Sequence, residues 1–234
     1  MACIHIILES FLFCFINIYY QDLLIGGSES FARTMELAMS ELLKQPHLIR
    51  KATKELDRVV GKDRWVEEKH IPQLPYIDAI MKETMRKNTT ALMLVPRLAL
   101  EDCNIAGYDI HKGSIVLINL WCMGRDPSIW DAPKEFRPER FLGKAIDVTR
   151  QNFELLPFGS GRRMCPGYSL GLKMISSTLA NMLHGFQWNF LANMKPEDLS
   201  TDEVPRACCG PKAKTPTSSL LICVCLYFGI LITS

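Results

Sequence analysis

Apolar and polar positions alternate with the period of an α-helix over the first third of the chain. Over residues 21–45 the apolar positions recur at steps of three and four. A second stretch, 46–60, sets an apolar face against a charged one and is followed by Gly61. A third, 75–86, begins with Pro75, which suits a first helical position. We therefore expect three helices before residue 87.

The period changes after the third helix. Short β-like runs cover 95–100, 104–110 and 114–117, and Gly107 and the turn at 111–113 interrupt them. Residues 126–149 are rich in proline and charge without a clean period, which indicates an ordered meander. A strong helical pattern returns at 167–184. The fold class expected is mainly α with a small antiparallel β-sheet.

Composition narrows the class of protein. The 234 residues are 48% hydrophobic and 22% charged, which is typical of a globular chain with a buried core. Lys and Arg number 27 against 25 Asp and Glu, so a net charge of +2 gives no reason to expect nucleic acid as a partner. Nine cysteines gather toward the chain ends instead of pairing across the middle, which favours a reducing compartment.

Both ends of the chain are apolar. Residues 4–20 carry no basic start and no small-residue cleavage site, so they are a poor match to a secretory signal. The run 220–232 is shorter than the roughly 20 residues that a spanning helix needs. We expect neither end to be a transmembrane segment.

The glycine-rich loop at 157–166 carries the most informative chemistry. Its glycines permit turns that direct several backbone N–H groups toward the sulfur of Cys165. The helix that begins at Gly167 points its positive end at the same sulfur, which favours thiolate over thiol. A metal-ligating cysteine needs that environment. For an arbitrary cysteine, a buried structural role is the commoner alternative.

The spacing of the loop outweighs that alternative. Phe158, Gly161, Arg163, Cys165 and Gly167 match the signature Phe-x-x-Gly-x-Arg-x-Cys-x-Gly. A five-position match of this kind arises by chance with odds on the order of one in ten thousand. On this loop the chain resembles the cytochrome P-450 monooxygenases, most closely the plant microsomal class that includes flavonoid 3'-hydroxylases. The resemblance implies that Cys165 binds the iron of heme b through its thiolate.

Further residues extend the resemblance. Glu83 and Arg86 form the family's Glu-x-x-Arg pair, and residues 136–141 match its Pro-Glu-Arg-Phe segment. The resemblance implies a buried structural network in which Arg140 joins this pair, whereas the spacing alone also fits a solvated surface pair. It also implies that Arg97 and Arg163 bind the haem propionates, because a guanidinium matches a carboxylate in a fork.

Residues 24–30 resemble the family's oxygen-binding motif. Gly26 and Gly27 each cost a helix about 1 kcal/mol relative to alanine, so we expect a local opening of the helix over a ligand. The resemblance makes Glu29 and Ser30 the catalytic acid and hydroxyl, with serine where threonine is usual. A helix start capped by Ser28 is the alternative.

The resemblance divides the chain into three parts. Residues 1–20 form an apolar leader unlike the family, 21–203 a partial haem domain, and 204–234 a divergent apolar tail. We interpret the chain as a truncated member that holds the C-terminal haem-binding half, with an alternative splice or a frameshift behind its two ends. After Arg86 the family usually continues Leu-His-Pro, whereas this chain has Lys87-Asn88-Thr89.

The resemblance also implies an activity. The reaction is insertion of one oxygen atom from dioxygen into a lipophilic plant metabolite. Its electrons come from an NADPH-dependent cytochrome reductase, at the cytosolic face of the endoplasmic reticulum membrane. The alternative is a catalytically inactive fragment that at most binds haem.

Overall fold

The computed structural model describes residues 2–144, 146–148, 152–190 and 230–233, with side chains described over 16–144, 146–148 and 152–188. Its long helices are α1 (Ala2–Lys44), α2 (Pro46–Val59), α3 (Pro75–Lys87) and α5 (Tyr168–Gly185). The shorter helical pieces are η1 (Glu68–Gln73), α4 (Leu120–Met123), η2 (Pro138–Phe141) and η3 (Gly161–Arg163). The strands are β1 (Arg97–Leu98), β2 (Cys103–Ile105), β3 (Tyr108–Ile110), β4 (Ile115–Val116), β5 (Gln187–Phe190) and β6 (Ile230–Thr233).

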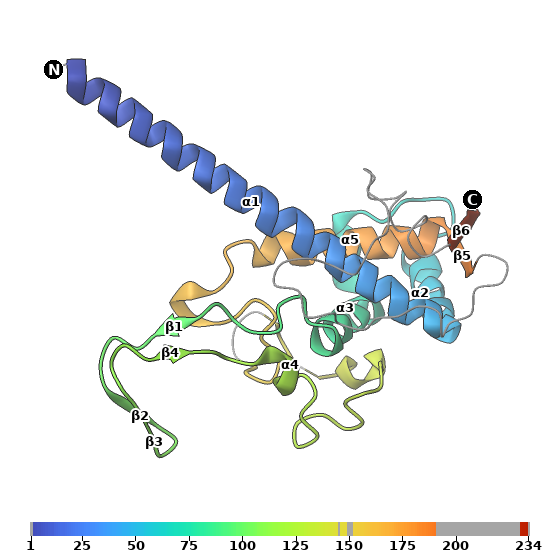
Figure 1. Cartoon of the computed structure of the whole chain (residues 1–234). Coiled ribbons are helices and arrows are strands. Elements are labelled where there is room, and N and C mark those ends of the chain that lie inside the picture. Colours follow the sequence, from blue (N-terminus) through green and yellow to red (C-terminus); the bar gives the residue numbers. More distant parts are fainter. Residues whose placement is uncertain (1, 145, 149–151, 191–229, 234) are drawn as a thin grey trace.

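Four helices enclose the main core. The C-terminal half of α1 packs against α3 and α5, and α2 lies beside α5 (Figure 1). Each helix contributes its apolar face, and the fully buried side chains include Met39, Leu42, Leu56, Ile80 and Leu179. A second cluster is formed mostly by meander residues, among them Trp130 and Phe141, and joins the main core through Phe158 and Leu172. The expected helical core is confirmed.

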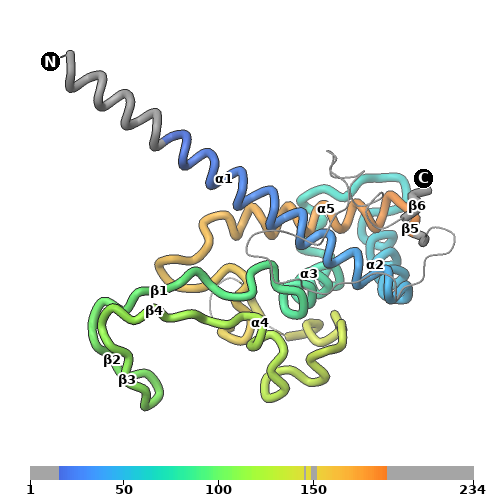
Figure 2. The backbone as a smooth tube through the Cα atoms, viewed as in Figure 1, coloured from blue at the N-terminus to red at the C-terminus, as the bar shows by residue number. Residues whose placement is uncertain are grey.

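The N-terminal half of α1 projects away from the core (Figures 1 and 2). The expectation that this helix begins near Gln21 was wrong, because α1 begins at Ala2 and continues to Lys44. Residues 16–30 are exposed, and from Thr34 onward the same helix enters the core. Within the described part of the chain, no helix is long and apolar enough to cross a membrane.

The described strands form three two-stranded antiparallel pairs, β1–β4, β2–β3 and β5–β6. The run expected over 104–110 is split into a hairpin, because Ala106 and Gly107 adopt φ angles of 52° and 89° between β2 and β3. In the tail, β6 pairs with β5 in the register Gln187 to Thr233. The expected antiparallel structure is confirmed, although as separate ribbons.

Candidate functional site

The loop before α5 presents Cys165 at the surface. Gly159 and Gly161 adopt φ angles of 70° and 69°, a left-handed conformation that side chains other than glycine rarely take. The Cys165 amide donates to the Phe158 carbonyl over 2.9 Å, which closes the loop. The Cys165 thiol is free and exposed, and Gly167, two residues later, is the N-cap position of α5. The loop therefore offers its sulfur outward at a helix N-terminus.

Phe158 anchors this loop to the body of the protein. Its ring lies 6.4 Å from that of Tyr168 in an edge arrangement, and it packs against both hydrophobic clusters. A Cβ at Gly171 of α5 would lie 3.8 Å from the Phe158 ring. Phe158 thus couples the position of the cysteine loop to α5 and the core.

Two arginines from distant parts of the sequence meet beside the loop. Arg97 on β1 donates from Nη2 to the Arg163 carbonyl over 3.5 Å. Leu94, before β1, lies against Gly159 of the same loop, where a Cβ would be 3.5 Å from its Cδ2. The structure therefore places Arg97 and Arg163 next to each other on the side of the molecule that carries Cys165.

Glu29 and Ser30 lie on the exposed part of α1. The expected opening of the helix at Gly26 and Gly27 is absent from the described residues, because α1 is continuous through both glycines. The hydroxyls of Ser28 and Ser30 instead donate to the carbonyls of Leu24 and Gly26, over 2.6 and 2.5 Å. The alternative that Ser28 caps a helix start was also wrong, since it lies inside α1.

Glu83, Arg86 and Arg140 form a buried ionic network. Arg86 donates to both carboxylate oxygens of Glu83, over 2.7 and 2.8 Å, and Arg140 Nε donates to Glu83 over 3.1 Å. The side chains of Glu83 and Arg86 are fully buried and that of Arg140 is 5% exposed. Glu83 and Arg86 therefore form an ion pair in the protein interior and not a solvated surface pair.

The same network holds the meander by its backbone. Arg86 donates to the carbonyls of Pro133 and Glu135 in the meander over 2.9 and 3.0 Å, and to that of Gly124 just before it over 2.5 Å. The Arg137 amide donates to Glu83 over 2.7 Å. These backbone partners could not be found from the sequence, because a carbonyl carries no residue signature and its position depends on the folded meander.

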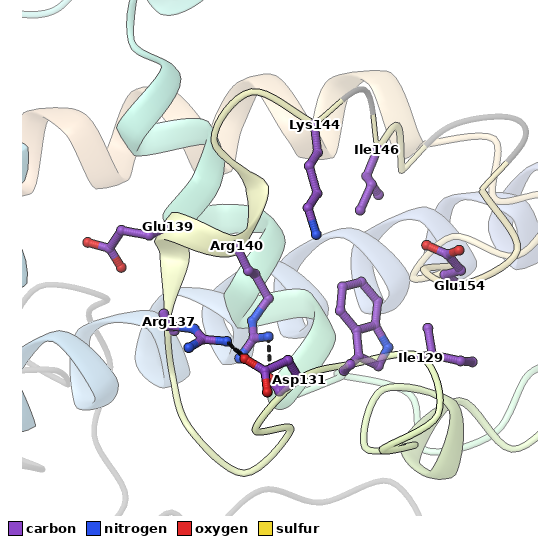
Figure 3. A pocket seen from close by; sticks show the side chains of 9 residues that line it. Ile129, Asp131, Arg137, Glu139, Arg140, Lys144, Ile146 and Glu154 are labelled. Atoms are coloured by element: carbon purple, nitrogen blue, oxygen red, sulfur yellow. Dashed lines mark hydrogen bonds and ion pairs between the residues drawn. The ribbon is translucent and has the colours of Figure 1, made fainter.

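A cavity of about 400 Å³ lies beside this network (Figure 3). Its walls carry both signs of charge, and the hydrogen bond from Arg137 to Asp131 holds the pKa of that carboxyl below its ordinary value. Arg140 donates to the carbonyls of Asp131 and Ala132 across one wall. The cavity is thus lined by charged side chains that also stabilise the meander.

Gly124 allows the closest approach in this region. A Cβ at this position would collide with the backbone carbonyl oxygen of Arg86. We expect Gly124→Ala to lower the free energy of unfolding by about 1–3 kcal/mol, since backbone must move to admit the methyl group. Urea denaturation measures the change. The control is Gly26→Ala, where nothing lies within 4 Å of the added atom and helix propensity alone favours alanine. Equal midpoints for both variants would contradict the packing of α3 on the meander.

Comparison with known proteins decides the family. The family model for Cytochrome P450 matches residues 15–212. The chain belongs to the cytochrome P450 family. A trimethyltridecatetraene synthase of Zea mays is 51% identical over 194 residues, which cover 81% of this chain and 35% of the synthase. A flavonoid 3',5'-hydroxylase of Crocosmia x crocosmiiflora is 42% identical over 186 residues, which cover 78% of this chain and 35% of the hydroxylase.

A solved cytochrome P450 has the same fold over this part. The zebra fish enzyme, in a structure with progesterone, superposes with a TM-score of 0.69 at 32% identity. The superposition covers 75% of this chain and 40% of the zebra fish chain. This cytochrome P450 chain spans about a third of the length of the curated relatives it matches. The expected fold class, a part of the P450 fold, is confirmed.

Proposed function

We propose that this chain is the haem-thiolate portion of a monooxygenase, with Cys165 as the ligand to the iron of heme b. The observation that carries the proposal is the free, exposed Cys165 at the N-terminus of α5, with Arg97 and Arg163 adjacent to one another. A thiolate suits iron and two guanidinium groups suit two propionates, so the donor set fits haem. Leu170 in the first turn of α5 is 64% exposed and offers an apolar surface for a porphyrin.

The signature residues of the loop each have a part in this proposal. Bound haem supplies the chemistry that activates dioxygen, and the thiolate donates electron density to it. Gly161 supplies a left-handed turn of the loop, Gly167 keeps the backbone close to the sulfur, where a Cβ would lie 3.9 Å from it, and Phe158 fixes the loop on α5. Arg97 and Arg163 orient the cofactor by its carboxylates.

Glu29 and Ser30 are proposed to move protons. The Ser30 hydroxyl holds its proton on the Gly26 carbonyl, one turn back along α1. Glu29 is exposed to water and can exchange protons with solvent beside it. A hydroxyl that turns from the carbonyl and gives its proton to a group in the site would take a proton from the carboxylate, which would take one from water.

The substrate and partners follow from the family. We propose a lipophilic plant metabolite as substrate and an NADPH-dependent cytochrome reductase as the electron donor, at the cytosolic face of the endoplasmic reticulum membrane. The relatives include a flavonoid 3',5'-hydroxylase and an iridoid oxidase, whose names describe oxidations of plant metabolites.

A second candidate function is haem binding without productive turnover. The exposure of residues 16–30, which include Glu29 and Ser30, favours it. Coupled oxidation requires that water be kept from the activated oxygen and that the substrate be held near it. The exposed residues 16–30 neither keep water away nor hold a substrate in place.

Titration of the 234-residue chain with haem, followed by assay with reductase and NADPH, tests both functions. We expect one haem per chain and NADPH consumption that yields peroxide or superoxide instead of product. Formation of product in step with NADPH consumption would reject the second candidate. Failure to bind haem stoichiometrically would reject both.

A further inference from the structure

The segment Lys87–Thr90 begins at the last residue of α3, at the point where the chain departs from the family's Leu-His-Pro. Three of its four side chains bond to α1. The bonded positions on α1 are Thr34 and Glu41, seven residues and therefore two helical turns apart on one face. This segment thus forms hydrogen bonds to α1 at two separate positions.

The first point is the carboxylate of Glu41. Lys87 Nζ donates to Oε2 and Asn88 Nδ2 donates to Oε1, each over 3.0 Å. The Glu41 side chain is only 4% exposed, so it needs both partners to compensate for burial. An apolar side chain at position 87 would not donate to Glu41. A proline at position 89 would not reproduce the backbone conformation of this segment.

The second point is a pair of hydroxyls. Thr34 Oγ1 donates to the Ser30 carbonyl over 2.8 Å and lies 3.0 Å from Thr90 Oγ1. A hydroxyl has one proton, and the Thr34 hydroxyl donates that proton to the Ser30 carbonyl. Thr90 is therefore the donor in its hydrogen bond with Thr34. The bonds therefore run in one direction, from Thr90 through Thr34 to the backbone of Ser30.

We propose that Lys87–Thr90 is a two-point clamp that sets the position of α1, and that Thr90 is a positioning residue for Ser30. Two points two turns apart fix both the rotation and the axial position of the helix. The carbonyl of Ser30 is held by a side chain as well as by the helix, so the turn that carries the hydroxyl is stabilised from the segment that follows α3. The part that concerns Ser30 in catalysis rests on the proposed function.

Thr90→Val removes the donor and keeps the shape. Hydrogen exchange of the 234-residue chain, read for the amides of residues 27–34, reports opening of this turn of α1. Loss of one hydrogen bond should speed exchange there about two- to tenfold. Thr90→Ser should restore protection, because it restores the hydroxyl. Thr89→Val is the matched control, since the hydrogen bond that the Thr89 hydroxyl makes among the described residues is to the Ala91 carbonyl, within its own loop.

The pattern of exchange decides whether the clamp operates. The clamp is supported if the amides of 27–34 exchange faster in Thr90→Val, but not in Thr89→Val, and if Thr90→Ser restores their protection. The hydrogen-exchange experiment needs no haem. Unchanged exchange there, or an equal loss of protection throughout the core, overturns it. In the haem-loaded chain, Thr90→Val should also shift the ratio of high-spin to low-spin ferric haem while Thr89→Val does not. Failure of every variant to bind haem, with the exchange pattern intact, rejects the proposed function and leaves the clamp supported.

Discussion

Replacing Arg86 with alanine should remove a large share of the free energy of unfolding of this chain. The substitution leaves the Glu83 carboxylate in the interior with Arg140 as its remaining cationic partner, and it removes the Arg86 donor from the carbonyls of Gly124, Pro133 and Glu135. Removing one member of a buried ionic network costs about 3–5 kcal/mol. Domains of this size are typically stable by only about 5–15 kcal/mol, so the loss takes a large share of the total.

The matched control for this prediction is Arg137→Ala. Arg137 lies in the same meander, but its side chain is 39% exposed and pairs with Asp131 at the surface. Its backbone amide, which bonds to Glu83, survives the substitution. We expect a change of about 0–1 kcal/mol for Arg137→Ala, measured by urea denaturation with circular dichroism. Similar midpoints for the parent and Arg86→Ala would mean that the network contributes nothing to the fold.

Replacing Cys165 with alanine should leave the fold intact and abolish thiolate ligation of haem. The thiol is exposed, so its loss opens no cavity in either hydrophobic cluster. The carbon monoxide spectrum of the reduced protein should lose its thiolate character entirely, and the stoichiometry of bound haem should fall. Cys103→Ala and Cys122→Ala are the controls, because both remove a free, exposed thiol elsewhere in the chain. A thiolate-type spectrum in Cys165→Ala would assign the ligand to another residue.

The helices of this chain were predictable because their apolar faces repeat over many residues. α2, α3 and α5 begin and end within about one or two residues of the pattern, helped by Pro46, Pro75 and Gly167. The N-terminus of α1 was not predictable, because residues 2–20 are apolar at most positions and show no clear amphipathic pattern or cap. The glycine pair was misjudged for a related reason: a local cost of about 1 kcal/mol per glycine does not break a helix that continues on both sides.

The candidate site shows a similar division. The cysteine loop and the Glu83–Arg86 pair are short in sequence, so their spacing carries the signal. The contact between Arg97 and Arg163, and the bonds from Arg86 to the meander, join residues far apart in the chain. The hydrogen bonds from Lys87–Thr90 to α1 were not predictable either, since nothing in the sequence spacing relates Thr90 to Thr34.

X-ray absorption at the iron edge of the haem-loaded chain tests the central claim most directly, because it reports the atoms bonded to the metal. The account predicts one sulfur ligand to iron in the parent chain and none in Cys165→Ala, with the Cys103→Ala and Cys122→Ala spectra unchanged from the parent. An iron bound only by nitrogen and oxygen in the parent chain, or a sulfur ligand that persists in Cys165→Ala, would contradict it.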